Sequence, residues 1–413
     1  MSIHLKFFPC SHGCRALQPS GLVAWTLVMG AALSSPAQAA VSDTIHPFAS
    51  IGYTHDDNLL RLEDGQELDG MRSDNVRQLQ AGFTFERPVG RQVFTGSAKA
   101  SRVSFDHFSQ LDYSGEDLQA TWNWALGNQL TGHLGATYSQ TIAPFSDFHS
   151  NQRNLKTQKH GFYDINWLFH PRWQVHAGYI KDTFDYDLAS QRFNNRTEKA
   201  TDAGFDFLAG TGSTVGLVAR RLTGNYPDAV RQGTFVQESG YTQDELKLKV
   251  LWRISDVTQL QFLGGRVKRR HEQSAEHDSS GTNARVTAQW APRERLRFSA
   301  AAWREFTAVE SSVLNYALGK GASVAAAWDV SAKIRLDAQL RSERRDFSGL
   351  IASALPISYD DKTSTASLGA TYAPTQSSQL NLVFAHDKRD PSNRLFSSAY
   401  RSNSVSLNAS IQF

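Results

Sequence analysis

The chain is dominated by segments in which apolar and polar residues alternate. In 246–252 one face is polar apart from Leu251, and the other consists of Leu246, Leu248, Val250 and Trp252. The segments 284–290 and 334–340 alternate in the same way. A period of two indicates β-strands with one apolar and one polar face. The segments run for about 10–14 residues, which is enough for a tilted strand to cross a bilayer, whereas strands of soluble proteins are nearer five or six.

Short turn sequences recur every 37 to 45 residues, and two strand-like segments joined by a longer polar loop lie between successive turns. The turns lie near Pro88, Gly127, Pro171, Gly212, Asp256, Arg293, Val330 and Thr375. Eight short turns separate nine hairpins, which predicts eighteen strands. Sixteen stays open if the weak pair 92–105 and 113–125 is misread. The longer loops predicted at the cell surface are 56–74, 142–155, 225–241 and 271–281.

An aromatic ring ends the apolar face of each strand that runs into a short turn. These rings are Phe85, Trp124, Trp167, Phe207, Trp252, Trp290, Trp328 and Tyr372. Rings at one level mark a membrane interface, here the periplasmic one. The pattern predicts an all-β fold, a transmembrane antiparallel up-and-down outer-membrane β-barrel. A β-propeller has a similar repeat length, but each of its blades needs four short strands.

Both ends of the chain fit export to the bacterial outer membrane. Residues 1–39 are typical of a signal peptide, with Lys6 and Arg15 before a twelve-residue apolar stretch and a small-residue cleavage site at 37–39. The barrel is predicted over 40–413. The last strand alternates up to Phe413, an ending that resembles the signal by which barrel assembly machinery recognises its substrates. The expected surroundings are outer-membrane lipids.

The composition speaks against several classes of function. Cys10 and Cys14 are the only cysteines and lie in the signal, so the mature chain has no thiol chemistry. Its 41 basic residues, 43 less Lys6 and Arg15, nearly balance 40 acidic ones, which gives no reason to expect nucleic-acid binding. The histidines of 271–278 are six apart, not four as a helical zinc motif requires. We predict no catalytic residue, no metal and no cofactor.

A basic cluster is predicted on the inward face of the C-terminal half. It consists of Lys247, Lys249, Arg253, Arg285, Arg295, Arg297, Lys333, Arg335 and Arg341. If these basic side chains had no acidic partners, the wall would attract anions into a confined lumen. The alternative is a network of internal salt bridges with acids on the same faces, such as Glu245, Glu305 and Glu343. The strand over 257–270 has apolar residues on both faces, so its phase is ambiguous.

The segment 53–62, Tyr-Thr-His-Asp-Asp-Asn-Leu-Leu-Arg-Leu, resembles the opening strand and loop of EpsL-type proteins. These are outer-membrane barrels of exosortase-associated exopolysaccharide biosynthesis operons. The resemblance implies a component of exopolysaccharide export, in contact with the polymer and with periplasmic export components. Transport would be passive, because no nucleotide-binding motif is present. Two alternatives stay open: a substrate-specific uptake porin, and a structural or adhesive barrel with a filled lumen.

Overall fold

The computed structural model describes most of the chain beyond the predicted signal. The described residues are 44–146, 148–229, 231–232, 235–236, 239–272, 278–308, 316–347, 359–394 and 397–413. The signal peptide predicted at 1–39 lies outside them. Within the described part, no helix is long and apolar enough to cross a membrane.

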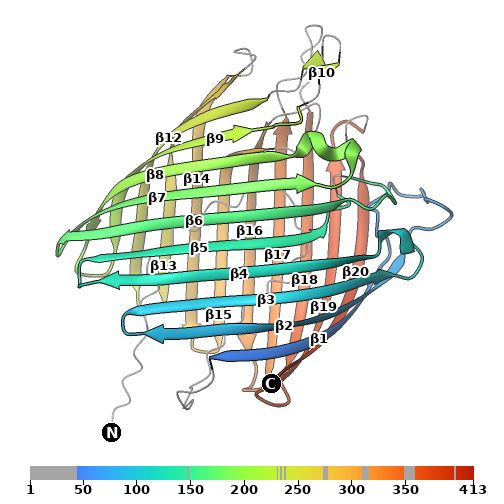
Figure 1. Ribbon diagram of the computed structural model, residues 1–413, viewed down its shortest axis with the longest axis horizontal. Helices are drawn as coiled ribbons and strands as arrows, with labels where there is room; N and C mark the ends of the chain where they lie inside the picture. The colour runs from blue at the N-terminus through green and yellow to red at the C-terminus, as the bar shows by residue number, and fades with distance from the viewer. Residues whose placement is uncertain are drawn as a thin grey trace.

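Eighteen antiparallel strands form one closed transmembrane barrel (Figure 1). The first nine are β1 (Ile45–Asp56), β2 (Asp74–Val89), β3 (Gln92–Phe105), β4 (Tyr113–Leu126), β5 (Leu130–Ile142), β6 (Leu155–His170), β7 (Trp173–Tyr186), β8 (Arg196–Leu208) and β9 (Thr214–Asn225). The other nine are β12 (Gly240–Ser255), β13 (Thr258–His271), β14 (Ser279–Arg293), β15 (Leu296–Ala308), β16 (Tyr316–Asp329), β17 (Ile334–Phe347), β18 (Tyr359–Tyr372), β19 (Ser378–Pro391) and β20 (Tyr400–Gln412). The weak pair of the sequence is the hairpin β3–β4, so the count of eighteen is confirmed.

The barrel closes where the last strand pairs with the first. β20 runs antiparallel to β1 from Phe48 opposite Gln412 to Asp56 opposite Ser404. The start of β1 and the end of β20 therefore lie at the same end of the barrel, as an even strand number requires. Closure leaves the sheet without a free edge, which is the condition for a sheet to span a bilayer.

The predicted alternation separates an outward from an inward face on each strand. On β12, Leu246 and Leu248 are 57% and 40% exposed on the outside, whereas Lys247 between them is 4% exposed. The ambiguous strand is β13, where Leu263 lies opposite the inward Lys249. Phe262, its neighbour, therefore faces outward. Because both faces of this strand carry apolar residues, the sequence did not show which face points inward.

The two ends of the barrel differ in the length of their connections. The short turns are 90–91, 127–129, 171–172, 209–213, 256–257, 294–295, 330–333 and 373–377, all at the predicted places. Gly90 and Gly127 adopt positive φ angles of 62°, which residues with a side chain rarely adopt. The long loops lie at the other end, with two short 3-10 helices, Ser109–Leu111 and Ala189–Asn194, and the small hairpin of β10 (Arg231–Gln232) and β11 (Phe235–Val236).

Two of the loops predicted at the surface are partly buried at this end. In the loop 57–73, Leu60 is fully buried and packs in a cluster with Phe108 and Leu111 from the β3–β4 connection. Phe145, in the loop 143–154, packs against the same cluster. Their leucine and phenylalanine side chains account for the difference, because an apolar side chain in a mouth loop gains more by packing than by facing water.

The strand phase predicts opposite outcomes for one substitution at two adjacent positions of β17. Leu340 is 62% exposed on the outward face, and Gln339 faces the lumen. Leu340→Arg places a charge against lipid and should cost roughly 2–4 kcal/mol of unfolding free energy near the midplane. Gln339→Arg should cost far less, because the new charge meets water. Denaturant unfolding in lipid vesicles measures both, and a larger loss for Gln339→Arg would show that the phase is wrong.

Candidate functional site

Six of the nine predicted basic residues lie on the inner wall, and each lies beside a carboxylate. The pairs are Lys247–Glu245 (2.6 Å), Lys249–Asp206 (2.8 Å), Arg285–Glu305 (2.7 Å), Arg297–Asp329 (2.8 Å), Arg335–Asp337 (2.8 Å) and Arg341–Glu343. The six carboxylates are all different, so this part of the wall is close to neutral. Asp206, Glu305 and Asp329 belong to other strands than their partners. The sequence pattern predicts Glu305 among the inward acids, whereas it does not predict Asp206 and Asp329.

The other three predicted basic residues lie at the rim that carries the short turns. Arg253 is exposed near the end of β12. Arg295 lies in the β14–β15 turn, and Lys333 lies in the β16–β17 turn, where its Nζ donates to the carbonyl of Pro374 at 3.0 Å. The prediction that Arg295 and Lys333 line the lumen extended the strand alternation past the ends of the strands.

Sequence reasoning missed a buried arginine on β13. Arg269 is 2% exposed on the inward face, and its guanidinium carbon lies 4.2 Å from the centre of the Tyr241 ring. It donates to Oε1 of Gln243 at 2.8 Å. The ambiguous phase of this strand hid the residue.

One sector of the wall carries mainly uncharged polar side chains, with a few apolar ones such as Phe48, Val76 and Val383 among them. It spans β18, β19, β20, β1 and β2, between the charged residues at the mouth and the short-turn rim. Its hydroxyl and amide side chains are Thr363, Thr365, Ser367, Thr371, Asn381, Ser404, Ser406, Asn408, Ser410, Ser50, Thr54, Gln78 and Gln80. Thr54 and Ser406 hydrogen-bond across the seam at 2.9 Å, and Ser50 donates to Gln80 at 3.1 Å.

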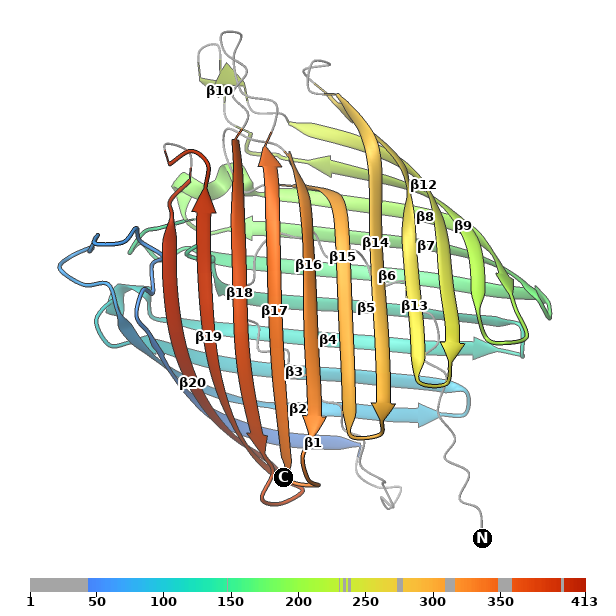
Figure 2. The same cartoon turned by 180° about the vertical axis from the view of Figure 1, so that it is seen from behind.

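The interior holds accessible space at mid-barrel. Gln119 on β4 and Gln339 on β17 face inward and are both exposed. Figures 1 and 2 show that β4 and β17 lie on opposite sides of the barrel. Two exposed glutamines on opposite walls mean that the described residues do not fill the space beside them.

The loop 143–154 reaches across the mouth to the inner face of β19. Arg389 Nη1 donates to the carbonyl oxygen of Ser146 at 2.7 Å, although 243 residues separate them. Arg389 also binds the fully buried carboxylate of Asp361, its Nε donating to Oδ2 at 2.9 Å, and Arg345 binds the same carboxylate at 3.0 Å. Charge-assisted hydrogen bonds of this kind are about twice as strong as neutral ones. The loop is therefore tied to the wall by a paired, buried arginine.

The segment that carries the resemblance forms a turn at the same mouth. Asp56 accepts from Arg61 Nη1 at 2.8 Å and from Ser402 Oγ at 2.7 Å. Asn58 is fully buried and its Nδ2 donates to the carbonyls of Leu62 and Arg401, both at 2.8 Å. Burial would lower the pKa of Arg61, but the adjacent Asp56 carboxylate outweighs it and the pKa is raised. These residues fix the loop to the seam between β1 and β20.

His149 joins the two loops. Its Nδ1 lies 3.0 Å from the carbonyl oxygen of Leu60, so this nitrogen carries the hydrogen. Burial, assisted by the charges of Arg389 and Arg61, holds the pKa of His149 below its usual value. The ring is therefore neutral in the assembled mouth at pH 7.

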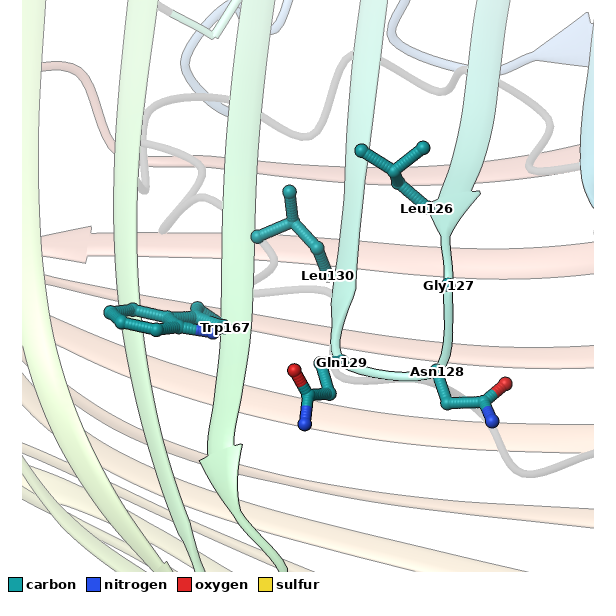
Figure 3. Close-up of a pocket in the computed structure, with 6 residues that line it drawn as sticks. All are labelled: Leu126, Gly127, Asn128, Gln129, Leu130 and Trp167. Carbon is teal, nitrogen blue, oxygen red and sulfur yellow. The ribbon is translucent and has the colours of Figure 1, made fainter.

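The eight predicted girdle rings lie on the outward face at the short-turn ends of their strands. Trp167, Trp252, Trp290, Trp328 and Tyr372 are 45 to 52% exposed. Figure 3 shows the β4–β5 turn, where Trp167 lies beside the side chain of Leu130, its partner across the strands. Phe413 is 72% exposed, and its N–H donates to the carbonyl of Pro47 on β1 at 2.8 Å. Its role as an assembly signal stays a prediction.

Comparison with known proteins gives only distant structural likenesses. No family model matches the chain, and no curated protein matches it. OpdK of Pseudomonas aeruginosa is 11% identical, with 89% of this chain and 99% of that chain covered and a TM-score of 0.48. OccAB3 of Acinetobacter baumannii is 11% identical, with coverage of 89% and 99% and a TM-score of 0.45. A mutant of the ferric enterobactin receptor PfeA of P. aeruginosa is 9% identical, with coverage of 90% and 80% and a TM-score of 0.45. Such values say nothing about what this chain carries.

The site also lacks a clustered donor set. Across the described ranges, no three His, Cys, Asp or Glu side chains gather as they would around a metal ion. Three histidines of the lumen, His133, His160 and His176, each lie instead beside one aspartate, as His160 does beside Asp182 at 2.7 Å.

Arg389→Met should release the loop 143–154. The loop would lose a hydrogen bond to a charged group, worth about 1.5–3 kcal/mol. Trypsin should then cut after the exposed Arg153 of this loop roughly 10- to 100-fold faster, if cleavage requires the released loop. Lys388→Met is the matched control, because Lys388 directly precedes Arg389 on β19 but faces outward. Equal cleavage of the Arg389 variant and the wild type would exclude this anchor.

Acid should loosen the same loop. Because the pKa of His149 is lowered in the assembled mouth, a released loop binds the proton more readily, and the contact is lost as pH falls below about 6.5. Hydrogen exchange of 143–154, corrected for the intrinsic rate, should be faster at pH 5 than at pH 7.5. His149→Gln should remove this difference, and a difference that persists would assign the acid response to another group.

Proposed function

We propose that this chain is a passive, porin-like channel of the outer membrane for small polar solutes, with an aperture set by the loops 57–73 and 143–154. The observation that carries the proposal is the accessible polar interior, where Gln119 on β4 and Gln339 on β17 are both exposed on opposite sides of the barrel (Figures 1 and 2). A barrel that served only as a scaffold would gain stability by filling this space. The accessible interior therefore favours a channel over a filled structural or adhesive barrel.

The wall favours solutes that form hydrogen bonds and carry no net charge. One sector offers hydroxyl and amide groups, which exchange hydrogen bonds with a sugar as readily as with water. The charged sector presents paired groups, and an ion pair attracts a passing anion much less than a single cation does. We therefore propose weak ion selectivity in place of the anion preference that the basic cluster alone would give.

A conduit for exopolysaccharide is the second candidate. It is supported by the resemblance at 53–62, whose residues Asp56, Asn58 and Arg61 hold the first loop at the mouth. On this proposal the hydroxyl and amide sector would contact the polymer, and periplasmic export components would meet the short-turn rim. No catalytic step is proposed for either candidate.

Conductance and solute flux test the channel. The purified barrel should conduct in a planar bilayer, and vesicles that contain it should swell in isosmotic small neutral sugars. The rate should fall as the sugar grows, and Arg389→Met should raise it by freeing the mouth. A barrel that conducts no current and passes no sugar, in the wild type and in the loop variant alike, would refute the proposal.

Ion selectivity tests the paired wall. The wild type should show a reversal potential near zero in a salt gradient. Glu305→Gln with Glu343→Gln removes the partners of Arg285 and Arg341 and should shift it toward anions. The shift should fade as salt rises from 0.1 M to 1 M, because the Debye length falls from about 10 Å to about 3 Å. Glu116→Gln, on the outward face of β4, is the control, and strong anion selectivity of the wild type would contradict the pairing.

The two candidates differ in cells. Deletion of the gene should slow uptake of small sugars if the chain is an uptake channel, and should reduce polymer at the cell surface if it is an export conduit. Loss of surface polymer with unchanged sugar uptake in the deletion mutant would favour the export conduit over the leading proposal.

A further inference from the structure

Four basic side chains lie directly beside one another on the outside of the barrel. Cross-strand pairing places Arg304 of β15 opposite Lys320 of β16, Lys320 opposite Arg344 of β17, and Arg344 opposite Lys362 of β18. We call these residues the outer basic row. Figure 2 shows the four strands side by side on one side of the barrel. The row belongs to the outward face and is separate from the lumen cluster.

The row lies at the outer end of the apolar band. On β18, Tyr372 of the aromatic girdle and Lys362 share the outward face and are ten residues apart. Ten residues span about 33 Å of strand, or about 25 Å of height at a tilt of about 40°. The apolar band of outer-membrane barrels is also about 25 Å tall. Lys362 is therefore level with the headgroups of the leaflet on the long-loop side. On β16, Lys320 is eight residues from Trp328, about 20 Å of height, so the row slopes toward the apolar band and its lower members reach the headgroups with their long side chains.

The protein neutralises only part of this charge. Lys320 and Arg344 share the carboxylate of Asp346 at 2.7 and 3.3 Å, and Arg344 also meets Asp360 at 3.1 Å. Arg304 Nη1 donates to Thr282, at 3.1 Å to its hydroxyl and also to its carbonyl, and neither Arg304 nor Lys362 has an ion pair among the described residues. Four cations thus meet two carboxylates.

Like charges directly opposite each other on a sheet are destabilising. Basic side chains near an anionic membrane surface gain about 1 kcal/mol each, and arginine binds phosphate in a bidentate manner. A row of cations at headgroup level is therefore complementary to a phosphate-bearing headgroup, which would relieve the repulsion within the row. Lys388 and Arg401, opposite each other on β19 and β20, lie beside the row, but Lys388 is paired with Asp390 at 2.5 Å and adds little net charge to it.

We propose that the outer basic row is a binding site for the phosphate of an anionic lipid in the outer leaflet. The lipid supplies two things that free phosphate does not: an acyl chain along the apolar face below the row, and a phosphate held at the level of the row. The site is independent of what passes through the lumen.

Thermal unfolding in zwitterionic micelles tests the site. The probes are dioleoyl phosphatidate, dioleoyl phosphatidylcholine with the same chains, and inorganic phosphate. Phosphatidate should raise the melting midpoint of the wild type, and the other two should not. The variant Arg304→Gln, Lys320→Gln, Arg344→Gln, Lys362→Gln should bind phosphatidate about 10- to 100-fold more weakly.

Two further variants keep the result interpretable. Arg172→Gln, Arg293→Gln, Arg295→Gln and Lys333→Gln together remove the same charge at the opposite rim and should leave the phosphatidate shift intact. If the fourfold row variant does not fold, Arg304→Gln with Lys362→Gln removes only the two cations without a carboxylate partner in the described part of the chain and should still weaken binding.

Three results would overturn the proposal. The row variants could keep the full phosphatidate shift, inorganic phosphate could reproduce it in the wild type, or the rim variant could lose it to the same extent. The second result would show a site for free anions, and the third would show a response to net charge alone.

Discussion

The structure depends on the pairing of β1 with β20. A sheet in lipid can leave no backbone N–H or C=O unpaired, so the first and last strands must meet. Their register runs from Phe48 opposite Gln412 to Asp56 opposite Ser404. The seam is reinforced at the mouth, where Asp56 and Asn58 bind Ser402 and the Arg401 carbonyl. The same contacts hold the loop 57–73, so barrel closure and the shape of the mouth share one set of residues.

Closure divides the side chains between two environments. Outward positions meet lipid and are apolar between the aromatic girdle and the outer basic row. Inward positions meet water, and their long charged side chains pair with one another on one side of the wall, beside a sector of hydroxyls and amides on the other. The two loops that cross the mouth add a narrower passage to this wall, so polarity and aperture are set by different parts of the chain.

The local pattern of the sequence predicted the barrel well. Strand number, turn positions and the inward face of Lys247 and Lys249 follow from a period of two, which each strand expresses by itself. The pattern failed at β13, where Leu263 faces inward, and past the strand ends at Arg295 and Lys333. It did not reveal which residues of other strands lie beside a given side chain, such as Asp206 beside Lys249. The contact of Arg389 with Ser146 spans 243 residues, and no local signal announces it.

We propose that the polar faces of the strands together enclose a water-filled passage. The cysteines of the chain lie only at positions 10 and 14, so single cysteines in the wall can be probed cleanly. Cysteines at Gln119 and Gln339 should react with a charged, membrane-impermeant thiol reagent and lower the current through the barrel. Cysteines at the adjacent Leu118 and Leu340, which are 48% and 62% exposed to lipid, should not react. Reaction at the leucine positions with none at the glutamines would contradict the account.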